Sequence, residues 1–157
     1  AAADVVASIQ PTHATSDKNM AGDRLGEDRL EGAYAWHTLL VSEAKLAGGS
    51  DFPVESVNPF FGLHAAVTRQ GKDNRPPGGW LPGEKLDRAQ TLSLFTEGAA
   101  YAAHQEQEIG RLLPGYSADF ILVRDDYFEM PEEQIWNNRV LATFVAGQRV
   151  FAAAAND

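Results

Sequence analysis

Apolar positions occur first in a short run and then at helical spacing, so the chain opens as alternating strands and helices. Residues 5–10 form a short apolar stretch closed by Pro11, which predicts a buried strand. The polar residues 12–17 that follow predict a functional loop. Between residues 27 and 44 apolar side chains repeat every three or four positions, which indicates a helix that packs one face on a sheet.

A second short apolar run, residues 45–47, leads through two glycines to Asp51. The glycines leave room for a ligand against the backbone, and Pro53 cannot extend a central strand, so we expect Asp51 at the carboxyl end of a strand. In a (β/α) barrel this end of the strands carries the catalytic residues. The alternative, which stays open, is that Asp51 starts a turn or caps the next helix.

Two further helices are predicted by their capping signals. Asn58 followed by Pro59 is typical of an N-cap and first turn, and Asp87 with Gln90 forms a capping box. The intervening loop is rich in glycine and proline. We expect Trp80 to pin this loop in preference to covering a cleft.

The last third of the chain changes to short strands. Residues 120–123 are apolar, and residues 140–151 alternate around a hairpin turn. This order of elements predicts an α/β fold, with residues 1–107 forming part of an α/β barrel and residues 108–157 forming part of a separate small β layer.

Composition and charge narrow the function classes. The chain has 157 residues, 44% of them hydrophobic and 22% charged, which is a globular composition. A net charge of −9 without any basic run argues against nucleic acid as a partner. No apolar run approaches the roughly 18 residues of a membrane span, and the absence of cysteine excludes thiolate metal sites. We therefore expect a cytoplasmic protein with neither a nucleic-acid nor a membrane partner.

Four segments, in this order, resemble the carboxyl-terminal part of the metal-dependent amidohydrolase superfamily. They are Ser8-Ile9-Gln10-Pro11-Thr12-His13, Gly49-Ser50-Asp51-Phe52-Pro53-Val54, Thr96-Glu97-Gly98-Ala99-Ala100 and Gly110-Arg111-Leu112-Leu113-Pro114-Gly115-Tyr116-Ser117-Ala118-Asp119-Phe120. The resemblance spans essentially the whole chain and points to the branch that includes N-substituted formamide deformylases. It implies the last strand–helix units of a TIM-type (β/α)8 barrel, followed by the carboxyl-terminal strands of a small β-sandwich.

The resemblance also assigns roles to three residues. It implies that Asp51 binds a divalent metal, zinc before others, and acts as general base and acid on a small amide-type substrate. It implies that His13 and Gln10 face the substrate. For His13 two other interpretations stay open: a loop histidine bonded to the backbone, and direct metal ligation as the minority view. His37 and His64 lie on apolar helix faces and are expected to be packed, whereas His104 is expected to be solvated.

Most metal ligands of the superfamily that this chain resembles have no counterpart among its residues. A zinc site needs about three protein ligands, and a complete barrel takes about 250 residues. We therefore expect a fragment of a hydrolase that cleaves carbon–nitrogen bonds of amides or cyclic amides. Alone, the chain would be inactive and would bind no metal stoichiometrically. The alternative is a noncatalytic half-barrel module for oligomerisation or binding that has lost its metal centre. Open strand edges predict a homo-oligomer in either case.

Overall fold

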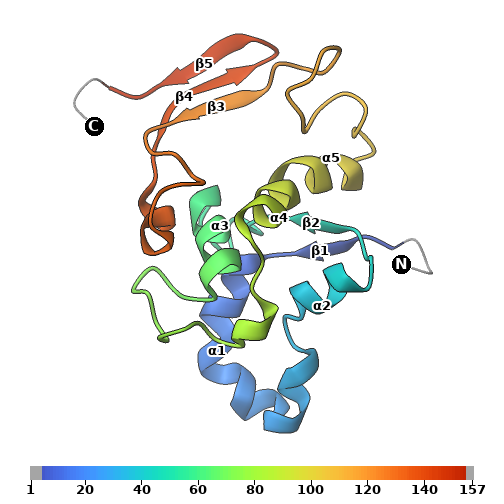
Figure 1. Ribbon diagram of the computed structural model, residues 1–157, viewed down its shortest axis with the longest axis vertical. Coiled ribbons are helices and arrows are strands. Elements are labelled where there is room, and N and C mark those ends of the chain that lie inside the picture. Colours follow the sequence, from blue (N-terminus) through green and yellow to red (C-terminus); the bar gives the residue numbers. More distant parts are fainter. Residues whose placement is uncertain (1–4, 155–157) are drawn as a thin grey trace.

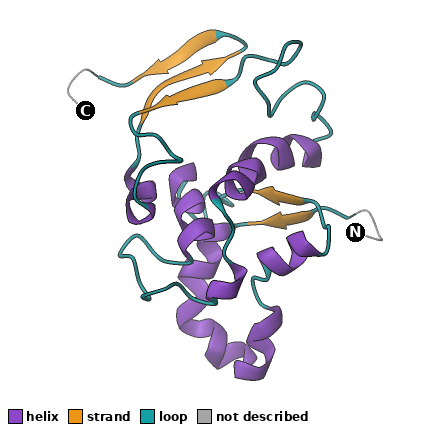
Figure 2. Cartoon of the chain, in the orientation of Figure 1, coloured by secondary structure: helices purple, strands orange, loops and turns teal. Residues whose placement is uncertain are grey.

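The computed structural model describes residues 5–154, which form an α/β fold with one two-stranded and one three-stranded sheet (Figures 1 and 2). The helices are α1 Pro11–Leu25, α2 Trp36–Val41, α3 Pro59–Thr68, α4 Arg88–Ser93 and α5 Ala99–Ala102. The strands are β1 Ala7–Ile9, β2 Leu46–Gly48, β3 Phe120–Val123, β4 Val140–Val145 and β5 Gln148–Ala152. Within these residues no helix is both long and apolar enough to cross a bilayer.

The first two strands form a parallel pair. Ala7 lies opposite Leu46, and Ile9 lies opposite Gly48. Both strands were predicted from their apolar runs. Strand β1 lies within the predicted residues 5–10, and β2 is shifted by one residue from the predicted residues 45–47. Because the pair is parallel, the segments that follow Ile9 and Gly48 leave the sheet at the same edge.

The segment after β1 differs from the prediction. Residues 12–17, predicted to be a loop, lie in the first half of α1. Pro11 lies in the first turn of that helix. Its fixed φ is compatible with the helix, and an N–H at this position would have no acceptor within the helix, so proline loses no hydrogen bond there. The proline therefore opens a helix as well as closing the strand.

The predicted long helix over residues 27–44 is also wrong in its extent. The chain forms a 3₁₀ segment over Glu27–Gly32 and resumes as an α-helix only at Trp36. Between the two, Tyr34 adopts a left-handed backbone (φ 52°), which no continuous right-handed helix contains. The apolar spacing marks the packed residues correctly but not the break.

Both capping signals are confirmed. The Asn58 side chain accepts a hydrogen bond from the Phe60 N–H at 3.0 Å and so starts α3. Asp87 accepts from the Gln90 N–H at 2.7 Å, and the Gln90 side chain accepts from the Asp87 N–H at 2.9 Å. This reciprocal pair starts α4.

The helix that begins at Arg88 changes its winding before it ends. The α-helical turns of α4 pass into a π-helical segment, Leu94–Gly98, and then into α5. At Gly98 the helix passes so close to β2 that a Cβ there would lie 2.2 Å from the Leu46 carbonyl oxygen. Only glycine fits this contact without a shift of the backbone.

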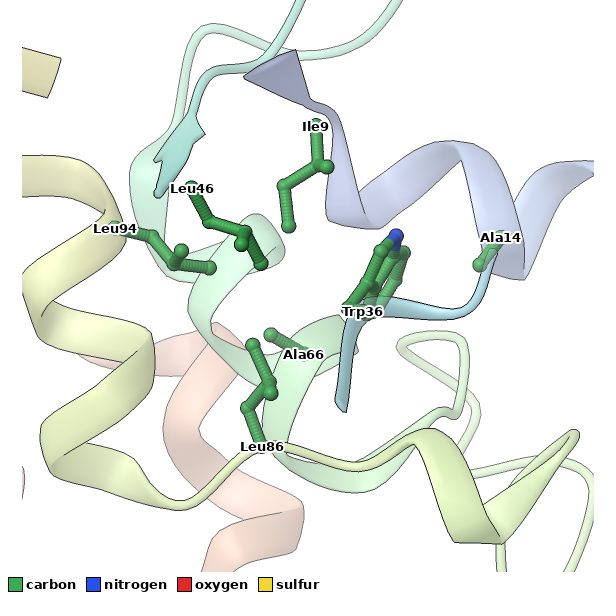
Figure 3. Close-up of a cluster of buried hydrophobic side chains, with 7 residues drawn as sticks. All are labelled: Ile9, Ala14, Trp36, Leu46, Ala66, Leu86 and Leu94. Atoms are coloured by element: carbon green, nitrogen blue, oxygen red, sulfur yellow. The ribbon is translucent and has the colours of Figure 1, made fainter. Parts of the chain in front are cut away.

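A hydrophobic cluster joins the parallel strands to the surrounding helices. Figure 3 shows side chains from both strands together with side chains from α1, α2, α3, the loop before α4 and the π-helical segment; the buried members are Ile9, Ala14, Trp36, Leu46, Ala66, Leu86 and Leu94. This cluster fixes the position of the edge at which β1 and β2 end.

The three-stranded sheet lies beyond the helices, in the order β3-β4-β5 with antiparallel pairing (Figure 1). Its strands and the hairpin between β4 and β5 follow the prediction. Residues 126–138, between β3 and β4, leave the sheet and pack on α3. Their shared cluster consists of Tyr127, Met130 and Ile135 with Phe60, Leu63 and Val67. The boundary at residue 107 stays a prediction.

Arg69, which no sequence pattern marks, ties three segments together at the end of α3. Its side chain is fully buried, and its Nε donates to the Trp80 carbonyl at 2.9 Å. Its Nη1 donates to the Tyr34 carbonyl at 3.1 Å, and the guanidinium lies 4.2 Å from the centre of the Trp36 ring. Burial lowers the pKa of Arg69 to about 10, so the group stays charged at neutral pH. These contacts hold Trp80 in place, as the pinning interpretation predicted.

Candidate active site

Asp51 lies three residues beyond the end of β2, in a turn. Gly49 stays attached to the neighbouring strand, since its N–H donates to the Ile9 carbonyl at 3.1 Å. The Asp51 backbone is left-handed (φ 56°), and its carbonyl accepts from the Val54 N–H at 2.7 Å. The two interpretations of Asp51 are therefore compatible: it stands at the carboxyl edge of the strands and within a turn. It does not cap α3, whose N-cap is Asn58.

His13 comes to the same place from the other strand. It lies in the first turn of α1, two residues after Pro11, and its Nε2 is 3.7 Å from Asp51 Oδ2. This separation allows ionic attraction when the imidazole is protonated, but it is longer than a hydrogen bond. Nε2 is buried and has no hydrogen-bond partner among the described residues. This nitrogen is therefore not hydrogen-bonded to the backbone, as one interpretation expected. It lies beside the Asp51 carboxylate without a hydrogen bond.

Contacts around the pair hold the two segments together. Ser16, one turn along α1 from His13, donates from Oγ to Glu55 Oε1 at 2.5 Å. The bond links α1 to the loop that carries Asp51. Gln10 donates from Nε2 to Ser8 Oγ at 3.4 Å and is not hydrogen-bonded to Asp51. The Ser16–Glu55 link spans 39 residues and carries no local signal that sequence reasoning could use.

The sequence comparison decides the family. Residues 1–151 match the Amidohydrolase family. The chain belongs to this family. The amidohydrolase chain is 33% identical over 147 residues to the Bacillus subtilis protein named "Putative amidohydrolase YtcJ", covering 94% of this chain and 28% of that protein. It thus spans about a quarter of the length of the curated relatives it matches.

Solved structures of similar proteins agree with the family. An uncharacterized metal-dependent hydrolase from Pyrococcus horikoshii matches with a TM-score of 0.72 and 29% identity, over 82% of this amidohydrolase chain and 26% of that one. A second, from Pyrococcus furiosus, matches with a TM-score of 0.61 and 34% identity, over 73% and 22%. The α/β arrangement of this chain therefore recurs inside much longer hydrolases.

The donor set of the amidohydrolase chain is incomplete for a metal. Two groups at the site carry atoms of the kind that bind metals. They are the Asp51 carboxylate, whose side chain is 54% exposed, and the His13 Nε2, which has no hydrogen-bond partner among the described residues. Residues 5–154 contain no group of three or more His, Cys, Asp or Glu side chains that could hold an ion. A zinc site takes about three protein ligands. The described residues fit part of a metal site and do not complete one.

The remaining histidines are packed or exposed. His64 is 1% exposed in α3, and its Nε2 lies 3.0 Å from Asn74 Oδ1. Burial lowers the pKa of His64. His37 is partly buried and His104 is exposed. The expectations that His64 is packed and that His104 is solvated are therefore confirmed.

The pKa of His64 gives a testable dependence of stability on pH. Its folded pKa lies below the ordinary value of about 6.5, so the unfolded chain takes up a proton first as the pH falls. We expect the free energy of unfolding to decrease from pH 7 to pH 5, measured by urea denaturation. The decrease should be smaller in His64→Gln and unchanged in His104→Gln, whose side chain is exposed. Equal pH profiles for wild type and His64→Gln would contradict the assignment.

Proposed function

We propose that this chain forms one side of the active site of a metal-dependent amidohydrolase that cleaves the carbon–nitrogen bond of an amide or cyclic amide other than a peptide. The observation that carries the proposal is the meeting of Asp51 and His13 at the shared carboxyl edge of two parallel strands. Such an edge is where strand-end residues perform chemistry in barrel enzymes. Among amidohydrolases, we assign the chain to the branch of N-substituted formamide deformylases.

Asp51 is the proposed general base and acid, and also a metal ligand. A bound divalent ion, zinc in this proposal, would make water more acidic and polarise the substrate carbonyl. The exposed Asp51 carboxylate can accept the proton of the attacking water and return it to the departing amine. A carboxylate suits this exchange because one group performs both transfers without moving out of the turn.

His13 and Gln10 are the proposed substrate-binding residues. The His13 Nε2 is buried and has no hydrogen-bond partner among the described residues, so it would bond to an amide beside Asp51 once the substrate displaces the atoms that cover it. Among the described residues, the Gln10 side-chain amide is held by one long contact, to Ser8 Oγ at 3.4 Å. Gln10 can therefore turn toward a substrate at little cost. The Ser16–Glu55 bond positions both sides of the site.

We further propose that the parallel pair and its helices are the last strand–helix units of a TIM-type barrel. Residues 1–107 would belong to this barrel, and the sheet of β3, β4 and β5 would belong to a β-sandwich. Likeness to hydrolase chains about three times as long supports this assignment. The proposal makes the chain one part of an enzyme whose other ligands lie on other strands.

The chain on its own is expected to bind zinc weakly and without fixed stoichiometry. Two donors facing each other across 3.7 Å supply fewer ligands than a closed site needs. Isothermal titration calorimetry with zinc should show a shallow, non-saturating heat. A one-to-one isotherm at micromolar concentration, lost in Asp51→Ala, would show that the chain holds a complete site.

One observation favours a second candidate function, a noncatalytic binding or oligomerisation module. No complete ligand set exists among residues 5–154. The two candidates differ in metal content: the purified longer hydrolase should contain one or two divalent ions per chain, whereas a module should contain none. Elemental analysis of the longer protein separates them.

Self-association is expected under either function. Strand β5 lies at the edge of its sheet, and all five of its residues are exposed. Open edges of this kind pair readily with a second chain, and a symmetric dimer is the simplest product. Light scattering at micromolar concentration should give about twice the monomer mass. A compact monomer with a cooperative unfolding transition would contradict this expectation.

A further inference from the structure

A cavity of about 480 Å³ lies between the start of α3 and the three-stranded sheet, outside the Asp51 site. Its walls are mostly apolar, and its lining residues include Val57, Phe60, Leu141 and Phe151. Three of these four side chains keep large exposed areas: 69% for Val57, 41% for Leu141 and 48% for Phe151. Its volume falls within the range of sites for small organic ligands. The cavity can therefore accept an apolar group of a few carbons.

The charge at this cavity is positive, in a chain with a net charge of −9. Arg139 is the charged residue among its described lining residues, and none of these is acidic. The Arg139 backbone is fixed, since its N–H donates to Asn138 Oδ1 at 2.8 Å and its carbonyl accepts from the Arg124 N–H at 2.9 Å. Within residues 5–154 its guanidinium makes neither an ion pair nor a hydrogen bond.

No carboxylate among residues 5–154 forms an ion pair with this guanidinium. Asp125, whose N–H donates to the Asn138 side chain, pairs with Arg124 at 2.7 Å. The opening of α3 at Asn58 and Pro59 lines the same cavity and adds the positive end of a ten-residue helix. The cavity thus combines an apolar wall with an unpaired planar cation.

We propose that this cavity binds a small carboxylate with an apolar tail. The tail would lie against Val57, Leu141 and Phe151, and the carboxylate would take two parallel hydrogen bonds from Arg139. A neutral molecule of the same shape would gain only the apolar contact. This accessory site is separate from the proposed chemistry at Asp51, and it can be present whether or not that proposal holds.

The test compares octanoate with octanamide, which has the same chain length and no charge. Each is titrated into the ¹⁵N-labelled chain, and amide shifts are followed by NMR. We expect saturable shifts at Val57, Leu141 and Phe151, and tighter binding of octanoate. Arg139→Gln should weaken octanoate binding about threefold to tenfold and leave octanamide unchanged. Raised salt should weaken octanoate alone, because the guanidinium is exposed.

Arg149→Gln is the matched control, since Arg149 is an exposed arginine on β5 that does not line the cavity. It should leave the affinity for octanoate unchanged. Phe151→Ala should weaken both ligands, since it removes an apolar wall that is already half exposed. Equal binding of the two ligands, equal effects of the two arginine variants, or shifts confined to other residues would each overturn the proposal.

Discussion

Replacing Asp51 with asparagine is expected to lower the turnover of the intact amidohydrolase by about 10² to 10⁴, which is the range for loss of a general acid–base group. The amide keeps the size of the side chain but neither accepts a proton at neutral pH nor binds a cation as a carboxylate does. Because the Asp51 side chain is 54% exposed and lies in a turn, folding should be almost unaffected. Steady-state kinetics with an amide substrate measures the loss.

Asp23→Asn is the matched control for this experiment. Asp23 is an exposed aspartate on α1, so the exchange removes the same charge from the same protein at a distance from the turn. We expect its turnover to equal that of the wild type. An Asp51→Asn enzyme that keeps most of its activity would refute the role given to Asp51, whatever the control shows.

The parts of the fold that follow from the sequence are those set by local chemistry. An asparagine before a proline and an aspartate three residues before a glutamine satisfy free N–H groups within one turn, so α3 and α4 start where the sequence predicts. The short apolar runs likewise become β1, β2 and β3. These features depend on neighbours in the chain and can be read without knowledge of the tertiary structure.

The errors occur where one residue type serves two conformations. Pro11 ends a strand and begins a helix, and the sequence pattern alone does not separate the two uses. Apolar spacing over residues 27–44 continues across a left-handed residue at Tyr34, because the side chains pack inward on both sides of the break. The apolar period identifies which side chains are buried. Here those side chains belong to two shorter helices, Glu27–Gly32 and Trp36–Val41, and not to one long helix.

The candidate site shows the same division. The Gly-Ser-Asp segment and the Gln-Pro-Thr-His segment each follow a strand, so their approach at one edge could be expected. The Ser16–Glu55 bond and the burial of Arg69 between distant segments depend on long-range packing. Nothing in the neighbouring residues marks them. The Ser16–Glu55 bond joins α1, which carries His13, to the loop that carries Asp51.

The second large effect is expected at Gly98, where the helix passes close to β2. Gly98→Ala should lower the free energy of unfolding by about 2 to 3 kcal/mol, the upper part of the usual range for forcing an extra carbon into a filled space. The added Cβ would lie 2.2 Å from the Leu46 carbonyl oxygen, and backbone on both sides would have to move. Urea denaturation followed by circular dichroism measures the loss.

Gly83→Ala is the control that separates crowding from the general effect of alanine. Gly83 lies in a short 3₁₀ segment, a Cβ added there would meet no atom within 4 Å, and its backbone is not left-handed. Alanine there should stabilise the protein by about 0.4 to 1 kcal/mol, because it restricts the unfolded chain. The two glycine variants should therefore change stability in opposite directions. A loss of less than about 0.5 kcal/mol in Gly98→Ala would mean that the helix can move away from β2, and that the edge carrying Asp51 is held less rigidly than the packing indicates.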